Sequence, residues 1–219
     1  MSDLVGWGLL SLRVAVLASI FGAAIAVPIA FVSARRRRWW ISVMDAMLTV
    51  PLLLPPTVLG FALIVVLGRH GPIGWLVREV SGTTLLFTEA AAVIAATIVA
   101  LPLIYLPAKS AFRAIDSELE DTARLWGASN WTLFWLISMP MARKGIIAGL
   151  VLGFARALGE FGATVMVLGI QGEQGKRTLP IAIWLDCSEG KYTDAWPAVL
   201  VLGLISVVVV SMYNRFMHL

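Results

Sequence analysis

Glu120–Pro140 of this 219-residue chain, EDTARLWGASNWTLFWLISMP, is a polar island between long apolar stretches. Acidic and small residues come first, Gly127 follows, and an apolar run then leads to Ile137 and Pro140. The pattern predicts one amphipathic helix with a small-residue stop. In a membrane protein, such a segment in the most basic loop indicates a docking surface for a cytosolic partner.

The composition of the whole chain is that of a membrane protein. Hydrophobic residues make up 59% of it, charged residues 14%, and its mean hydropathy is +0.89, values that do not suit a soluble domain. Several apolar runs reach the length that a bilayer core requires, about 20 helical residues. We therefore expect an all-α integral membrane protein with a single transmembrane domain, 1–219. The predicted spans are about 9–33, 41–67, 87–106, 145–168 and 196–216, with a cytoplasmic loop at 107–144.

The placement of Lys and Arg predicts the orientation of these spans, because cytoplasmic loops carry the excess of positive charge. With the N-terminus outside, ten basic residues lie in inside segments and five in outside loops. Arg35–Arg38 follow the first apolar run directly and hold that end inside. The run is too long for the apolar part of a cleavable signal peptide. The prediction is an outside N-terminus and a cytoplasmic C-terminus.

The sequence contains little that could perform catalysis. It has no GxxxxGK[ST] motif, so it cannot hold ATP phosphates through a P-loop of its own. His70 and His218 are far apart, and the single cysteine, Cys187, excludes an internal disulfide. No spaced His, Cys or carboxylate cluster suggests a metal site. We expect no catalytic residues, no metal and no cofactor on this chain.

The second predicted span contains Pro51-Leu-Leu-Leu-Pro55-Pro56-Thr57, which must interrupt a regular helix. Prolines remove backbone hydrogen bonds, and the freed carbonyls then need protein, water or hydroxyl partners. One interpretation is a kink that only packs against neighbouring helices. The other is a pathway-lining element made by Pro55, Pro56 and Thr57, in which Thr57 offers a hydroxyl to a polar solute.

The fourth predicted span has two features. Gly145, Gly149 and Gly153 recur every four residues and predict a smooth face that another helix can approach closely. Arg156 and Glu160 are an i,i+4 pair of opposite charge inside the hydrocarbon region, where charges normally face protein or water and are often paired. This pair either locks two helices structurally or belongs to the pathway or gate.

The segment 120–140 resembles the EAA loop of binding-protein-dependent ABC importers, the loop that docks onto the ATPase subunit. Six residues before Gly127 stands Asp121, where that family usually has the Glu of Glu-Ala-Ala. Four further blocks resemble the molybdate ABC transporter permeases: PLLLPPTVLGF (51–61), GRHGPIG (68–74), FARALGEFGATVMVLG (154–169) and GEQGKRTLPIAIW (172–184). The blocks are spread over 51–184, and the resemblance extends over almost the whole chain.

The resemblance implies the type I ABC importer permease fold in a bacterial or archaeal cytoplasmic (inner) membrane. It implies a homodimer with the pathway along the two-fold axis, a cytosolic ATPase dimer that binds ATP and Mg, and a periplasmic or lipid-anchored oxyanion-binding protein. Membrane lipid surrounds the assembly, and nucleic acid is not a partner. ATP-driven closure of the ATPases would switch the pathway between outward and inward states.

The coupling role carries over to named positions of this chain. They are Glu120, Asp121, Ala123, Gly127, Ile137 and Pro140. The small side chains would let the helix fit a groove, and an acidic group would meet a basic residue of the ATPase. The chain departs from the family pattern at Asp121, which is shorter than Glu, and at Thr122 and Met139.

Two alternatives stay open. Tungstate and sulfate are tetrahedral dianions similar to molybdate, so this chain could serve a permease for either. A secondary transporter driven by an ion gradient is a different class. Such folds generally show internal repeats and intramembrane ionisable groups, whereas this sequence shows no repeat and only Glu160 as a coupling carboxylate. A purely scaffolding subunit would leave the proline-broken span and the charge pair without a purpose.

Overall fold

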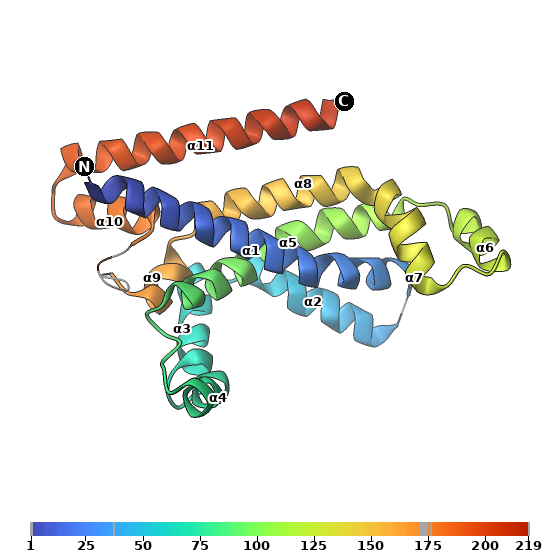
Figure 1. The fold of residues 1–219 in the computed structure, drawn as a ribbon, viewed down its shortest axis with the longest axis horizontal. Helices are drawn as coiled ribbons and strands as arrows, with labels where there is room; N and C mark the ends of the chain where they lie inside the picture. Colours follow the sequence, from blue (N-terminus) through green and yellow to red (C-terminus); the bar gives the residue numbers. More distant parts are fainter. Residues whose placement is uncertain (1, 37, 171–174, 176, 219) are drawn as a thin grey trace.

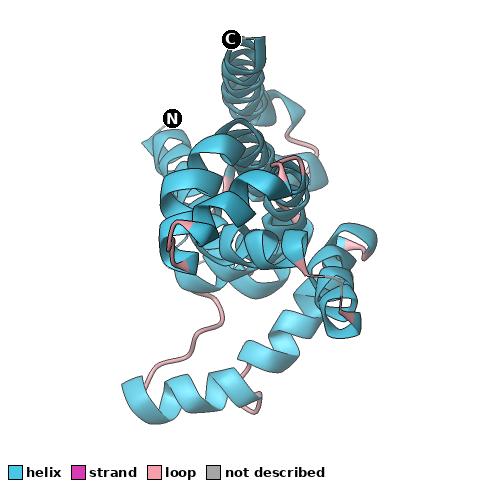
Figure 2. Cartoon of the chain, turned by 90° about the vertical axis from the view of Figure 1, so that its right-hand side faces the viewer, coloured by secondary structure: helices cyan, strands magenta, loops and turns pink. Residues whose placement is uncertain are grey.

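The computed structural model describes residues 2–36, 38–170, 175 and 177–218, and the described residues form helices and no strand (Figures 1 and 2). The elements are α1 (Ser2–Arg35), α2 (Trp39–Leu53), α3 (Pro56–Leu67), α4 (Pro72–Ser81), α5 (Glu89–Arg113), α6 (Ser117–Leu125), α7 (Asn130–Thr132), the π-helical η1 (Leu133–Ser138), α8 (Met139–Leu158), α9 (Gly162–Leu168), α10 (Leu179–Ser188) and α11 (Tyr192–His218). The all-helical prediction is confirmed.

The core of the bundle is α5, which packs against both α1 and α8. Alanine and other small residues dominate these contacts, including Ala92, Ala96 and Ala100 of α5, each 0% exposed. Small side chains let helix backbones approach closely, which is how helices associate when lipid removes the hydrophobic driving force. Tyr105 and Phe112 are the largest buried side chains and fill the α6-proximal end of this core.

Four helices within the described chain are long and apolar enough to span a membrane, and a bent pair could make a fifth span. The four candidates are Leu4–Arg35, Glu89–Arg113, Asn130–Leu158 and Tyr192–Arg215. Figure 1 shows α11 starting near the N-terminal end of α1 and running in the direction of the end that carries α6. Figures 1 and 2 show α11 along one edge of the bundle, opposite the projecting α3 and α4.

The second predicted span is a sharply bent pair rather than one kinked helix. α2 continues through Pro51 to Leu53, and α3 starts again at Pro56 with its axis turned by 116°. Adjacent prolines explain the position of the break. Neither Pro55 nor Pro56 has an N–H to continue the hydrogen-bond ladder, and each disfavours the α conformation in the residue before it.

The fourth predicted span, 145–168, is also divided. α8 begins earlier than expected, at Met139, and ends at Leu158, and α9 follows after the non-helical residues 159–161. Gly159 and Gly162 lower helix propensity at this point. Glu160, the residue before the N-cap Phe161, satisfies one N–H of the first turn of α9, because its carboxylate accepts a hydrogen bond from the Ala163 N–H at 2.8 Å.

The predicted loop 107–144 is mostly helical. α5 runs on to Arg113, and α6, α7, η1 and the start of α8 fill the remainder. Arg37, Lys176 and part of the 172–184 block lie outside the described residues.

Candidate functional site

The segment around Gly127 forms two helices that meet at a turn, and the expected single helix over 120–140 is wrong. α6 ends at Leu125, and Gly127 has φ +84°, a left-handed conformation that favours glycine. Its N–H donates to the Arg124 carbonyl at 2.9 Å, which closes the end of α6. Ser129 then caps the next helix by accepting a hydrogen bond from the Thr132 N–H at 3.1 Å.

The turn and the start of the next helix carry highly exposed apolar side chains. Leu125 and Trp126 are each 88% exposed, and Trp131 is 71% exposed. α6 and α7 project beyond the ends of α5 and α8 at the right of Figure 1. We call Leu125, Trp126, Gly127 and Trp131 the docking tip. Sequence reasoning named only its glycine, although the pairing of Leu and Trp beside a stop signal in a polar helix was visible.

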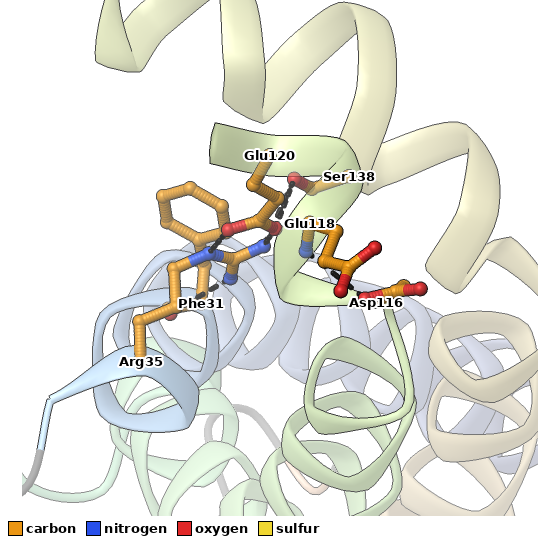
Figure 3. Close-up of polar contacts among 6 residues, drawn as sticks. All are labelled: Phe31, Arg35, Asp116, Glu118, Glu120 and Ser138. Atoms are coloured by element: carbon orange, nitrogen blue, oxygen red, sulfur yellow. Dashed lines mark hydrogen bonds and ion pairs between the residues drawn. The ribbon is translucent and has the colours of Figure 1, made fainter. Parts of the chain in front are cut away.

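The other predicted coupling residues occupy different environments. Asp121, Gly127 and Pro140 are exposed, whereas Ala123 and Ile137 are half-buried. Glu120 differs from all of them, because it is only 8% exposed and points into the bundle. Its carboxylate is paired with Arg35 at the end of α1 (Figure 3). An acidic contact with a partner would therefore fall to Asp121 and not to Glu120.

A polar cleft lies between α6 and the ends of α1 and α5. Its volume is about 530 Å³, and its charged lining consists of Arg35, Arg113, Glu120, Asp121 and Arg124. Basic residues outnumber acidic ones in this lining. Arg35 and Glu120 neutralise each other as an ion pair, so the remaining charged lining consists of Asp121, Arg113 and Arg124.

The two helix breaks lie against each other inside the bundle. α3 packs on α9, and a Cβ atom on Gly162 would lie 2.7 Å from Cβ of Pro56. A Cβ atom on Gly60 would likewise meet Cβ of Met166 at 2.7 Å. Glycine at both positions thus permits the close approach of the two short helices. Of the predicted pathway residues, Pro55 and Thr57 are exposed and Pro56 is partly covered by this contact.

Arg156 and Glu160 form the predicted ion pair, with Nη1 of Arg156 2.5 Å from Oε2 of Glu160. The contact lies outside hydrogen-bond geometry. The Glu160 side chain is 1% exposed and the Arg156 side chain 31%. The carboxylate also accepts the Ala163 N–H in the first turn of α9, so the pair lies at the α8–α9 break and joins the two helices. The Arg156 guanidinium is the solvent-accessible end of the pair.

Glu160→Gln is expected to lower stability by about 1–3 kcal/mol, the usual loss when a buried polar group loses its partner. The amide can still accept the Ala163 N–H, but it leaves the Arg156 charge unpaired. Thermal unfolding of the solubilised chain measures the effect. The double variant Arg156→Met/Glu160→Gln removes both charges and should recover part of the loss. Wild-type stability of the single variant would contradict the pairing.

The glycine face of α8 lies against α5 of the same chain. A Cβ atom on Gly149 would stand 2.8 Å from the carbonyl oxygen of Ile104 and 3.2 Å from its Cα. Gly153 faces the Ile104 side chain, and Gly145 faces Ala111 and the Pro107 carbonyl. Gly149 is therefore the position where the two backbones come closest.

Sequence reasoning missed a second buried charge cluster. Asp45 of α2 accepts hydrogen bonds from Tyr105 and Lys109 of α5. A charged residue inside an apolar run needs a partner, and that rule could have singled out Asp45 from the sequence. Among the residues that the structure describes, no group of three His, Cys, Asp or Glu residues could hold a metal ion.

The sequence was also compared with those of known proteins and protein families. Residues 26–219 match the family described as "Binding-protein-dependent transport system inner membrane component". The chain is 40% identical over 177 residues to the molybdenum transport system permease protein ModB of Escherichia coli, covering 80% of this chain and 76% of that protein. It is 37% identical over 205 residues to ModB of Mycobacterium tuberculosis, covering 93% and 75%.

Solved structures of low sequence identity share the fold. A chain of the inward-facing MetNI methionine ABC transporter superposes with a TM-score of 0.76 at 18% identity, covering 100% of this chain and 96% of that one. A chain of a bacterial ABC transporter involved in the import of the acidic polysaccharide alginate gives 0.78 at 13% identity, covering 100% and 80%.

Proposed function

The chain belongs to the inner-membrane components of binding-protein-dependent transport systems and has the type I ABC importer permease fold, and from this we propose that it is the permease subunit of an ATP-driven molybdate importer. The substrate assignment rests on the relatives, which are molybdenum transport permeases of bacteria and archaea. Tungstate and sulfate are the alternatives, because their dianions have the same shape and charge.

The observation that carries the proposal is the docking tip. A projecting helix that ends in Leu125 and Trp126, each 88% exposed, leaves a large apolar surface uncovered. Contiguous exposed apolar patches mark surfaces that a partner covers. Acidic Glu118 and Asp121 stand exposed on the same helix, and they suit a basic groove. In this family the expected occupant of such a tip is a cytosolic ATPase, which binds ATP and Mg.

The pathway in this proposal runs between two copies of the chain. The helix breaks at Pro55–Pro56 and at residues 159–161 supply irregular backbone in mid-membrane, which is tolerated where it lines a cavity or is buried in protein. Exposed Thr57 and the accessible guanidinium of Arg156 would contribute polar groups there. A periplasmic or lipid-anchored binding protein would deliver the oxyanion at the end of the bundle opposite α6, which places the N-terminus outside.

The environment of Glu160 argues against an ion-gradient-driven transporter. One oxygen of the Glu160 carboxylate accepts a hydrogen bond from the Ala163 N–H, and the other oxygen is paired with Arg156. A coupling carboxylate must bind and release a cation or proton during each cycle. A group that holds two helices together in this way is poorly suited to that task.

Reconstituted vesicles test the proposal. The chain, its ATPase and its binding protein are incorporated together, and uptake of molybdate, tungstate and sulfate is measured with and without ATP. We expect ATP-dependent uptake of molybdate with preference over sulfate. Uptake that needs no ATPase and follows an imposed ion gradient would refute the proposal, and preferential sulfate uptake would refute the substrate.

Trp126→Ala is expected to weaken capture of the ATPase by the solubilised chain at least tenfold. Large aromatic side chains are typical hot spots of interfaces, where truncation costs about 2 kcal/mol or more. The binding constant from titration of labelled ATPase provides the measurement. Trp75→Ala is the matched control, because Trp75 is 56% exposed on α4, away from α6. Equal affinity of both variants and wild type would show that the tip does not bind the ATPase.

A further inference from the structure

α6 is attached to the rest of the molecule through a single buried side chain. Of the nine residues of α6, all of which the structure describes, Glu120 is the one that is buried. The main helix contact of α6 is with η1. The helix that ends in the docking tip therefore has almost no apolar anchorage of its own. Whatever force reaches α6 must pass mainly through Glu120 and the short connections at its ends.

Arg35 at the end of α1 holds this carboxylate with a two-pronged contact (Figure 3). Its Nε donates to Oε2 of Glu120 at 2.6 Å, and its Nη2 donates to Oε1. The planar guanidinium matches a carboxylate in this way and fixes direction as well as distance. An ion pair of this geometry resists tilting of α6 relative to α1 far better than a single contact would.

Ser138 extends the contact to a third element. Its hydroxyl accepts a hydrogen bond from Nη2 of Arg35 at 3.0 Å and donates to Oε1 of Glu120 at 3.3 Å. Ser138 is 0% exposed and is the last residue of η1, directly before α8. The three side chains thus join α1, α6 and the start of α8 at one point (Figure 3).

Neighbouring groups keep the guanidinium in place. Nη1 of Arg35 donates to the Phe31 carbonyl at 3.1 Å, and the Phe31 ring centroid lies 3.8 Å from its Cζ. Phe112 and Phe134 surround Phe31 in edge contacts. Arg113 and Arg124 line the same cleft, so Glu120 also compensates a locally positive field.

We propose that Arg35, Glu120 and Ser138 form a strut that transmits movement of α6 to α1 and α8, with Glu120 as its central positioning residue. The inference rests on the proposed function, because it assumes that an ATPase moves α6. Without the strut, α6 still docks through its exposed tip, but its displacement reaches the bundle only through the short connections at 114–116 and 126–129. ATP is then hydrolysed without a corresponding movement of the transmembrane helices.

The transport stoichiometry tests the strut. Purified complexes with Glu120→Ala are compared with wild type for ATPase capture, ATP hydrolysis and molybdate uptake in vesicles. We expect capture within about threefold of wild type and a fall of at least tenfold in molybdate transported per ATP hydrolysed. Glu79→Ala is the matched control, an exposed acid on α4 outside the docking surface, and should keep the wild-type ratio. An unchanged ratio in Glu120→Ala overturns the proposal.

Charge exchange separates the strut from a merely structural pair. Arg35→Glu and Glu120→Arg should each lower the amount of molybdate transported per ATP hydrolysed, and the double variant should recover at least part of this ratio. Arg35→Lys keeps the charge but loses the fork, so it should give an intermediate ratio. If Glu120→Ala does not fold, Arg35→Lys and Glu120→Gln supply the measurement. A ratio that stays constant while only protein yield falls assigns the pair to folding and overturns the proposal.

A distance measurement on the chain alone distinguishes failure of the strut from failure of the proposed function. Spin labels at Leu125→Cys and Val32→Cys, in a Cys187→Ser background, report the position of α6 relative to α1. A narrow distance distribution in wild type that broadens in Glu120→Ala supports the strut whatever the partner is. Equal widths contradict it. A wild-type chain that captures no ATPase contradicts the proposed function instead.

Discussion

Replacing Gly127 by arginine is expected to reduce ATP-driven molybdate uptake at least tenfold while the chain still folds and inserts. Gly127 is exposed at the turn after α6, and among the described residues nothing lies within 4 Å of the place where a Cβ would stand. The new side chain therefore meets no internal clash, but it places bulk and positive charge at the centre of the docking tip. Each 1.4 kcal/mol lost from that interface lowers affinity tenfold.

Two controls isolate this effect from backbone strain. Gly127 has φ +84°, which costs an L-residue about 1–2 kcal/mol. Gly82 closes α4 with φ +68° in equally open surroundings within the described part of the chain, so Gly82→Arg carries the same strain at the other end of the bundle. Gly127→Asn tolerates the left-handed conformation and should keep more activity than arginine. Equal uptake by Gly127→Arg and wild type would remove the docking assignment.

Gly149→Leu is expected to prevent normal packing of α8 on α5 and to lower stability more than any other single change considered. Even the Cβ of alanine would stand 2.8 Å from the Ile104 carbonyl oxygen, and backbone cannot move aside as a flexible side chain can. Overpacking of this kind costs about 1–3 kcal/mol, and leucine adds further atoms. Unfolding of the solubilised chain in increasing SDS measures the loss.

The glycines of the chain form a graded series for this test. Gly153→Ala meets the flexible side chain of Ile104 and should destabilise less than Gly149→Ala. Gly203→Ala on α11 has no described atom within 4 Å of its Cβ and should leave stability near wild type. A reversed order would mean that α5 and α8 do not pack in this way in the membrane.

The fold class was predictable because long apolar runs, prolines and glycines act locally. The positions of the breaks at Pro55–Pro56 and near Gly159 follow from missing N–H groups and low helix propensity. The size of the bend, 116° between α2 and α3, depends on the packing of α3 against α9. The glycines that permit this packing, Gly60 and Gly162, come from distant parts of the sequence.

The docking segment was located from sequence, but its geometry was not. Its polar composition and Gly127 marked the place, whereas the division into two helices depends on a left-handed turn and on the Ser129 cap. The pairing of Arg35 with Glu120 joins residues 85 apart in sequence. Arg35 belongs to a run of four arginines, and nothing in the sequence of that run marks Arg35 as a residue that turns inward. Such long-range partners require the three-dimensional structure.

The central claim is that the docking tip is where the ATPase meets this chain, and site-directed cross-linking tests it most directly. A single cysteine at Leu125 in a Cys187→Ser background is treated with a short thiol–amine cross-linker in the purified complex. The account predicts a product of the chain with the ATPase, and none from a cysteine at Trp75. Capture of the ATPase without a cross-link at Leu125, or with an equal one at Trp75, would contradict the account.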